Sequence, residues 1–208
     1  MRQYVFLLTF LLLSSAGQAQ FNIAFGYNAG AFTTPQRNFE ILEYSYRNVM
    51  PGFKVPNFLY GASVGFRLED DNTLAEFLFT HKKMTTHKYD YVGSDGETYD
   101  YKLKMQLRTL NFGFAFGIEN LKLGVSMDIG RYRAMRKNGM SSDDPEWEKY
   151  YGMNTWFGGF TFFAPIRLGV FELRPYFQMS WFVDKFGVSE HTHRSDNIGI
   201  NLSYVWER

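Results

Sequence analysis

The chain has 208 residues, no cysteine and a formal net charge of +1, which supports neither a disulfide-stabilised fold nor a basic surface for nucleic acid. No nucleic-acid partner is therefore expected. Aromatic residues form 19% of the chain, yet the mean hydropathy is −0.29. A β-barrel reconciles these two values, because its strands alternate large apolar residues with small or polar ones.

Residues 1–19 are predicted to be a cleaved signal peptide. Arg2 precedes an apolar run over residues 4–13, and the small residues Gly17 and Ala19 mark a cleavage site. This run is too short to cross a bilayer, and no later segment approaches the about 20 consecutive apolar residues of a spanning helix. Residues 20–208 are predicted to form one barrel domain that enters a membrane by strands.

Eight segments after this leader alternate in the manner of strands. The apolar faces of the first three are formed in turn by Phe21, Ile23, Phe25 and Tyr27; by Tyr60, Ala62, Val64, Phe66 and Leu68; and by Ala75, Phe77 and Phe79. Residues 69–72 (EDDN) form a tight-turn signal between the second and third strands.

The fourth segment, residues 99–118, changes phase. The apolar residues around Leu103 share one parity, whereas those from Leu110 onward share the other. One extra residue in the strand restores the outward facing of the apolar set. A β-bulge is therefore predicted near Arg108 and Thr109.

Four further strands complete the set. Residues 121–130 alternate cleanly, residues 156–168 contain Pro165, where a local irregularity is expected, and residues 174–183 form the seventh strand. The closing strand, residues 197–208, has a small and polar second face, and its apolar face is formed by Ile198, Ile200, Leu202, Tyr204 and Trp206.

Short and long connections alternate along the chain. The links near Asp70, Asn120 and Phe171 are short, whereas long loops are predicted over residues 31–57, 86–98, 134–151 and 184–195. This asymmetry predicts an all-β fold, an eight-stranded antiparallel transmembrane up-and-down β-barrel of a Gram-negative cell outer membrane, with the short turns and both termini in the periplasm. A lipocalin-like barrel and a soluble β-sandwich are alternatives, but a second face of Gly, Ala, Ser and Asn suits a narrow interior better than a solvated surface.

The leader, the eight strands and the ending at residues 199–206 (GINLSYVW) resemble the small outer-membrane β-barrel families of Bacteroidota, PorT-like and OmpA-like in general form. The resemblance implies a terminal insertion signal for the barrel-assembly machinery, formed by Gly199, Leu202, Tyr204 and Trp206 and followed by Glu207 and Arg208. It also implies contact with outer-membrane lipid and lipopolysaccharide. Such families have many roles, so the fold does not choose among them.

Several polar residues are predicted to lie on the inward face or at the bulge. One interpretation is a conducting pore. The favoured one is a polar plug, because an eight-stranded barrel is only wide enough for its own side chains, and buried opposite charges pair. These interior residues are Arg67, Glu76, Arg108, Asp128, Arg167, Arg174 and Gln178.

His193 and Ser195 are the best enzymatic candidates. Residues 193–195 (HRS) match the start of the His-x-Ser-Asn motif of eight-stranded lipid A deacylases, in which Ser is the nucleophile and His the base. Asp196 displaces the Asn of that motif to Asn197. The alternative interpretation is a hydrophilic loop that enters a strand.

Metal binding has two weak candidates. His191 and His193 form half of a possible site, and His81 and His87 are the only other histidines. The acidic residues 141–148 (SSDDPEWE) lack the spacing of a calcium loop. Neither a metal nor a cofactor is predicted.

The longest predicted loop contains a possible partner-docking segment. Residues 34–37 (TPQR) have the form of a helix start with Thr34 as its N-cap. Apolar residues then recur at helical spacing at Phe39, Leu42, Tyr46 and Val49. An amphipathic helix here would either dock a partner or cover its own apolar face on the barrel rim.

These observations favour a non-enzymatic structural or accessory subunit of an outer-membrane protein assembly, which contacts other outer-membrane proteins through its lipid face and external loops. A lipid A-modifying enzyme and a small-solute channel are the alternatives.

Overall fold

The computed structural model describes residues 20–33, 57–92, 96–140, 146–186 and 189–207. In these ranges the strands are β1 (Gln20–Phe32), β2 (Phe58–Glu69), β3 (Thr73–Val92), β4 (Thr98–Ile118), β5 (Leu121–Met140), β6 (Glu148–Phe163), β7 (Ile166–Leu168), β8 (Phe171–Phe186) and β9 (Ser189–Glu207). The predicted signal peptide, residues 1–19, lies outside the described residues. So do Phe39, Leu42, Tyr46 and Val49 of the predicted docking segment.

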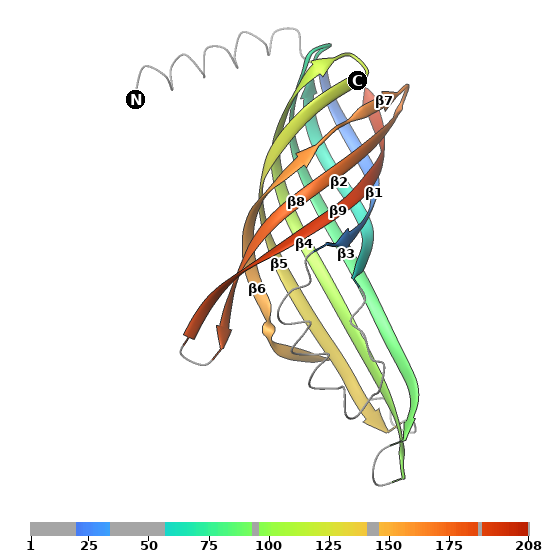
Figure 1. Cartoon of the computed structure of the whole chain (residues 1–208). Helices are drawn as coiled ribbons and strands as arrows, with labels where there is room; N and C mark the ends of the chain where they lie inside the picture. The colour runs from blue at the N-terminus through green and yellow to red at the C-terminus, as the bar shows by residue number, and fades with distance from the viewer. Residues whose placement is uncertain (1–19, 34–56, 93–95, 141–145, 187–188, 208) are drawn as a thin grey trace.

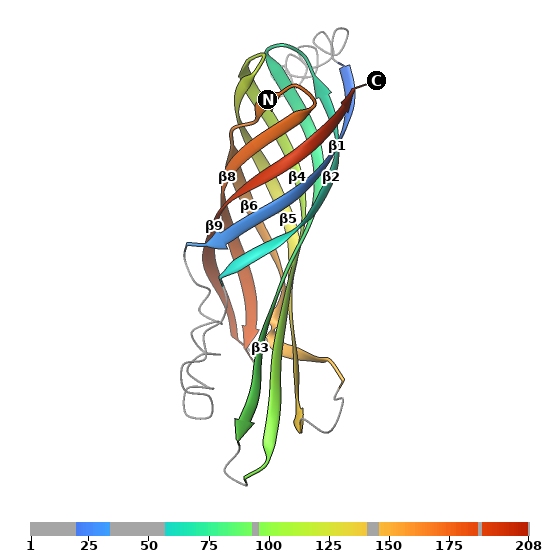
Figure 2. The ribbon, with the colours of Figure 1, turned by 90° about the vertical axis from the view of Figure 1, so that its right-hand side faces the viewer.

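The strands form one antiparallel ring (Figures 1 and 2). The first strand pairs with the last, from Asn22 opposite Glu207 to Phe32 opposite Asn197, and β4 pairs with β5 on the far side. β6 and the short β7 are consecutive segments that both lie between β5 and β8. The nine strands therefore fill eight positions in the ring, and the predicted eight-stranded antiparallel barrel is confirmed.

The break between β6 and β7 falls at Ala164 and Pro165. Proline has no N–H to donate to a strand ladder. Its carbonyl still accepts a hydrogen bond from the Lys122 amide at 3.2 Å, and the Ala164 amide donates to the Pro175 carbonyl at 3.1 Å. The irregularity predicted at Pro165 is confirmed.

The two ends of the ring differ (Figures 1 and 2). At one end the predicted short turns join β2 to β3, β4 to β5 and β7 to β8, the last through Gly169, whose φ of 65° favours glycine. At the other end three predicted loops are largely strand. The prediction of loops over residues 86–98, 134–151 and 184–195 is therefore wrong for most of each range. Of the fourth predicted loop, residues 31–57, residues 34–56 lie outside the described residues.

The β-bulge predicted near Arg108 and Thr109 is also wrong. β4 pairs with β5 without any shift from Tyr99 to Ile118, and its pairing with β3 is regular on both sides of Arg108. The inward residues keep one parity throughout, since Leu107 and Thr109 are both buried. Arg108 consequently lies on the outer face and is exposed, not in the interior where it was predicted.

The phase change in the sequence of β4 marks the point at which apolar and polar residues exchange faces of the strand. From the short turns to Leu110, the outer face of β4 is apolar and the inner face is small or polar. Beyond Leu110 the outer face carries Arg108 and further polar residues, and the inner face becomes apolar from Leu107. A strand that passes from lipid into water requires this exchange. We call it the polarity inversion.

The outward apolar residues between the short turns and the polarity inversion form a belt around the ring, here called the apolar belt. In β4 the belt covers residues 110–118, which suits the about 9–11 residues that a tilted strand needs to cross a bilayer. Representative members are between 43% and 60% exposed: Phe25, Phe66, Phe112, Met127, Phe160, Phe171 and Ile200. A continuous exposed apolar surface of this kind marks contact with lipid or protein.

Beyond the inversion, the interior of the ring is filled by a buried apolar cluster. Its members come from β1 through β6 and from β8: Phe32, Leu59, Met84, Tyr101, Leu103, Met105, Leu107, Tyr132, Ala134, Phe157 and Phe182. The far end of the barrel is thus built like a soluble protein, with apolar residues inside.

Candidate functional site

Four buried charges form an alternating chain across the lumen at the level of the apolar belt. The Arg67 guanidinium donates two hydrogen bonds to the Glu172 carboxylate, at 2.6 and 2.8 Å. Its Nε lies 3.3 Å from Glu76, which also pairs with Arg174 through a 2.7 Å hydrogen bond. Paired, fork-like contacts of this type are the strongest that arginine makes with carboxylates. We call these four residues the charge quartet.

A second carboxylate, Asp128, is held by neutral donors. It accepts hydrogen bonds from Asn111, Ser126, Thr161 and Gln178 at distances between 2.5 and 2.9 Å. These donors come from β4, β5, β6 and β8, so this one side chain links four strands. Full hydrogen bonding offsets the cost of burying its charge.

A third group contains the buried Lys82. Its Nζ donates to the Tyr176 hydroxyl at 2.8 Å, and that hydroxyl donates to Asn28 at 2.8 Å. A cavity of about 30 Å³ remains beside these side chains, enough for one water. The interior here is therefore packed by the barrel's own side chains.

The buried charges of the described residues balance. There are four cations and four anions, of which Asp196 lies on the outer face beside Arg194 and the others face the lumen: Arg67, Lys82, Lys122, Arg174, Glu76, Asp128, Glu172 and Asp196. An isolated charge at such depth would be costly. The seven that face the lumen are each held by a hydrogen bond to another side chain of the barrel.

The structure places five of the seven predicted interior residues inside the lumen: Arg67, Glu76, Asp128, Arg174 and Gln178. Arg167 lies at the lumen's mouth and is half-buried, and Arg108 lies outside. Lys82, Glu172 and Tyr176 were missed as site residues. Their inward parity was readable from the alternation, but their partners lie on strands distant in the chain.

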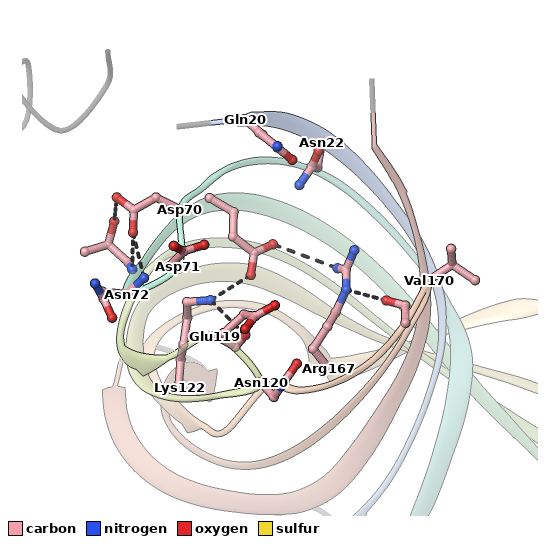
Figure 3. A pocket seen from close by; sticks show the side chains of 13 residues that line it. Gln20, Asn22, Asp70, Asp71, Asn72, Glu119, Asn120, Lys122, Arg167 and Val170 are labelled. Carbon is pink, nitrogen blue, oxygen red and sulfur yellow. Dashed lines mark hydrogen bonds and ion pairs between the residues drawn. The ribbon is translucent and has the colours of Figure 1, made fainter. Parts of the chain in front are cut away.

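The end with the short turns opens into a polar pocket of about 730 Å³ (Figure 3). Glu69 lies between two cations there: Lys122 donates to it at 3.0 Å, and Arg167 lies 3.9 Å away. The Arg167 Nε also donates to the Gly169 carbonyl at 2.6 Å. These contacts join all three short turns to the lumen wall.

Asp70 shapes the turn between β2 and β3. Its carboxylate accepts hydrogen bonds from the amides of Asn72 and Thr73, at 2.8 and 2.6 Å, and from the Thr73 hydroxyl at 2.7 Å. Burial alone would raise the pKa of Asp70. The hydrogen bonds from Thr73 and Asn72, with the Lys122 ammonium nearby, outweigh burial and hold this pKa below its usual value of 3.8.

We expect Asp70→Asn to weaken the barrel at neutral pH and to have less effect in acid. Because the folded pKa of Asp70 is lowered, its stabilisation is present above pH 3.8 and is lost as the pH falls through the folded pKa. Urea unfolding of both proteins at pH 7 and at pH 3 measures this. A difference that stays constant between the two pH values would contradict the assignment.

The candidate enzymatic residues lie in β9. Ser195 is buried, 1% exposed, and its backbone pairs with Ser180. His193 pairs with Phe182 in the ladder, but the side chains of His191 and His193 lie outside what the structure describes. Ser195 therefore faces the interior and not the apolar belt.

The described ranges contain no group of three or more His, Cys, Asp and Glu side chains placed to hold a metal ion. Most of the acidic segment, residues 141–145, lies outside them. They also contain no helix that is long and apolar enough to cross a membrane.

The proposed insertion signal lies at the end of β9 beside the short turns. Leu202, Tyr204 and Trp206 lie on the apolar belt and are 44% to 52% exposed, whereas Gly199 faces the lumen. A side chain at Gly199 would collide with the Ala29 carbonyl and the Tyr176 ring. Gly199 therefore has a packing role in the barrel.

Comparison with known proteins gives a likeness of fold. No protein-family model matches the chain, and no curated protein matches its sequence. Ail, the attachment invasion locus protein of Yersinia pestis, solved in complex with the heparin analogue sucrose octasulfate, is 12% identical, with 91% of this chain and 99% of Ail aligned and a TM-score of 0.53.

Two further structures have lower scores. The N-terminal β-barrel domain of Pseudomonas aeruginosa OprF is 12% identical over 91% of this chain and 100% of that domain, with a TM-score of 0.47. Neisserial surface protein A is 10% identical over 88% and 96%, with a TM-score of 0.45. The likeness to Ail shows that the chain has the fold of a small eight-stranded outer-membrane barrel.

Proposed function

We propose that this chain is an integral outer-membrane barrel that acts as a non-enzymatic structural or accessory subunit of an outer-membrane protein assembly. The observation that carries the proposal is the polarity inversion along β3 to β5. These strands first present apolar residues such as Phe112 outward, and then continue well past β1 and β2 with a polar outer face (Figures 1 and 2). The barrel thus anchors a sheet that projects into water.

The orientation follows from the ends of the ring. Outer-membrane barrels keep short turns in the periplasm and longer connections outside. In this orientation β1 begins and β9 ends in the periplasm, and the projecting part of β3 to β5 is external. Residues 199–206 then meet the barrel-assembly machinery during biogenesis, as the resemblance of this ending implies.

Two features support a role other than catalysis or conduction. Ser195 is buried on the lumen side, where an acyl chain in the membrane does not reach a nucleophile. The charge quartet and the donors around Asp128 fill the lumen across its width. A barrel of this size is just wide enough for such filling.

The test is co-purification of the tagged full chain from outer membranes in mild detergent after crosslinking. We expect a defined outer-membrane protein to co-purify with it. Replacing residues 86–98 at the tip of the β3–β4 hairpin with a two-residue turn is expected to remove that partner, because the external sheet supplies the contact.

The matched control keeps the β3–β4 hairpin at its full length. Instead, Glu119 and Asn120, in the periplasmic turn between β4 and β5, are changed to Asn and Gly. This variant should keep the partner. Folding of each variant is checked by its heat-dependent mobility in gel electrophoresis. A wild-type chain that emerges alone from every crosslinked preparation would remove the subunit proposal.

A further inference from the structure

The outer face of β3 to β5 beyond the apolar belt is strongly basic. Of the eleven outward positions in residues 81–85, 102–108 and 131–137, seven carry Lys or Arg and none carries Asp or Glu. The eleven are His81, Lys83, Thr85, Lys102, Lys104, Gln106, Arg108, Arg131, Arg133, Met135 and Lys137. We call this surface the basic patch.

Strand register concentrates these charges. Arg108 lies directly opposite Arg131, and Lys102 lies directly opposite Lys137. Like charges in such positions lie about 5 Å apart at Cβ and disfavour the pairing. The register therefore places cations side by side across the β4–β5 pair.

The basic patch contains a built hollow of about 40 Å³ between β4 and β5. Its lining residues are Gln106, Arg108, Arg131 and Arg133. The Nε of Arg133 is buried and has no hydrogen-bond partner among the described residues. Guanidinium groups grouped in this way match the oxygens of a phosphate, which they bind in pairs of parallel hydrogen bonds.

The basic patch begins where the apolar belt ends. Arg108 is the next outward residue of β4 after Leu110, and Arg131 follows Ile129 in β5 in the same way. Trp156, 64% exposed, pairs with Arg131, whose guanidinium carbon lies 5.7 Å from the indole centroid. Tryptophan favours the membrane–water interface. The patch therefore lies at the depth of lipid headgroups.

We propose that the basic patch binds the phosphate groups of an outer-leaflet glycolipid of the lipid A type, with Arg108 and Arg133 as principal ligands. The inference rests on the proposed function, which puts this end of the barrel outside. The acyl chains of the bound lipid lie along the apolar belt next to Leu110 and Ile129, and its phosphorylated sugars reach the hollow. One lipid thus contacts both surfaces.

The experiment uses the full chain in phosphatidylcholine nanodiscs that also contain bis-phosphorylated lipid A or its dephosphorylated form. Native mass spectrometry counts the lipid A that stays bound. We expect wild type to retain the phosphorylated lipid and not the other. Arg108→Gln with Arg133→Gln should weaken retention about tenfold or more, since charged hydrogen bonds are lost.

The matched control is Arg194→Gln. Arg194 is an exposed cation of β9 outside the patch, and it has its own partner, Asp196, at 2.9 Å. This variant should retain lipid A as wild type does. Equal retention of lipid A by the double variant and by wild type would overturn the proposal. Equal retention of phosphorylated and dephosphorylated lipid A by wild type would overturn it too.

Inorganic pyrophosphate serves as a soluble probe of the same chemistry. Pyrophosphate that binds to the detergent-solubilised chain as tightly as lipid A does would assign the patch to a soluble anion and overturn the glycolipid assignment. Insertion into vesicles, measured by protease protection, is scored first. A chain that fails to insert defeats the proposed function as well, whereas an inserted chain without phosphate-dependent retention defeats the patch alone.

Discussion

Arg67→Met is expected to lower the free energy of unfolding by about 3–5 kcal/mol. The guanidinium of Arg67 is fully buried and contacts two carboxylates, those of Glu172 and Glu76. Removing it leaves two buried anions with Arg174 as the remaining cation of the charge quartet. Urea unfolding of the refolded barrel, followed by tryptophan fluorescence, measures the loss.

Two companion variants identify the cause. Arg67→Met combined with Glu172→Met removes one charge of each sign and should recover most of the lost stability, because well-packed apolar residues replace buried ion pairs at little cost. Arg194→Met removes an arginine from an exposed pair and should leave the unfolding midpoint near wild type. A double variant no more stable than Arg67→Met would mean that shape, and not charge, governs the lumen.

Met127→Arg is expected to cost about 2–4 kcal/mol of stability in a bilayer, whereas Met135→Arg should cost about 1 kcal/mol or less. Both methionines lie on the outer face of β5, but Met127 is 60% exposed within the apolar belt and Met135 lies beyond the polarity inversion. The two variants make the same chemical change on one strand. Reversible unfolding from phospholipid vesicles measures both.

The same pair tests where the membrane ends. If the strand carried a bulge at Arg108 and Thr109, the apolar residues of β4 on both sides of it would face lipid, and the belt would reach past Met135. Equal losses for Met127→Arg and Met135→Arg would therefore support the bulge and contradict the inversion.

Within the apolar belt, the parity of each strand could be predicted because lipid imposes a strict alternation. Phe112 and Met127 face outward as the alternation indicated, and Gln178 and Asp128 face the lumen. The interruption at Pro165 was predictable for an equally local reason, the missing N–H donor.

The loops failed because the same rule was applied where lipid is absent. Beyond Arg108 most of the outer residues are charged or polar, so the alternation reverses and resembles either a bulge or a polar loop. The sequence around Leu103 and Met105 did indicate a strand, because apolar and polar residues alternate there as regularly as in the rest of β4. The loop prediction assumed that the strands end where the apolar belt ends, whereas β3, β4 and β5 continue beyond it as paired strands.

The lumen partners could not be predicted for a different reason. Arg67 and Glu172 are 105 residues apart and lie on β2 and β8. Alternation shows that both face inward, but their height along the barrel depends on the tilt and stagger of every strand between them.

The polarity inversion also affects how the chain reaches its place. In the proposed orientation, the distal halves of β3, β4 and β5 have to pass through the hydrocarbon layer with Lys83, Arg108 and Arg133. Placing a cationic side chain at the bilayer midplane costs about 2–4 kcal/mol. Crossing therefore presents a transient barrier that the finished barrel no longer shows. Unassisted insertion into intact lipid should be slow for this protein, and thin or locally disordered membrane should speed it.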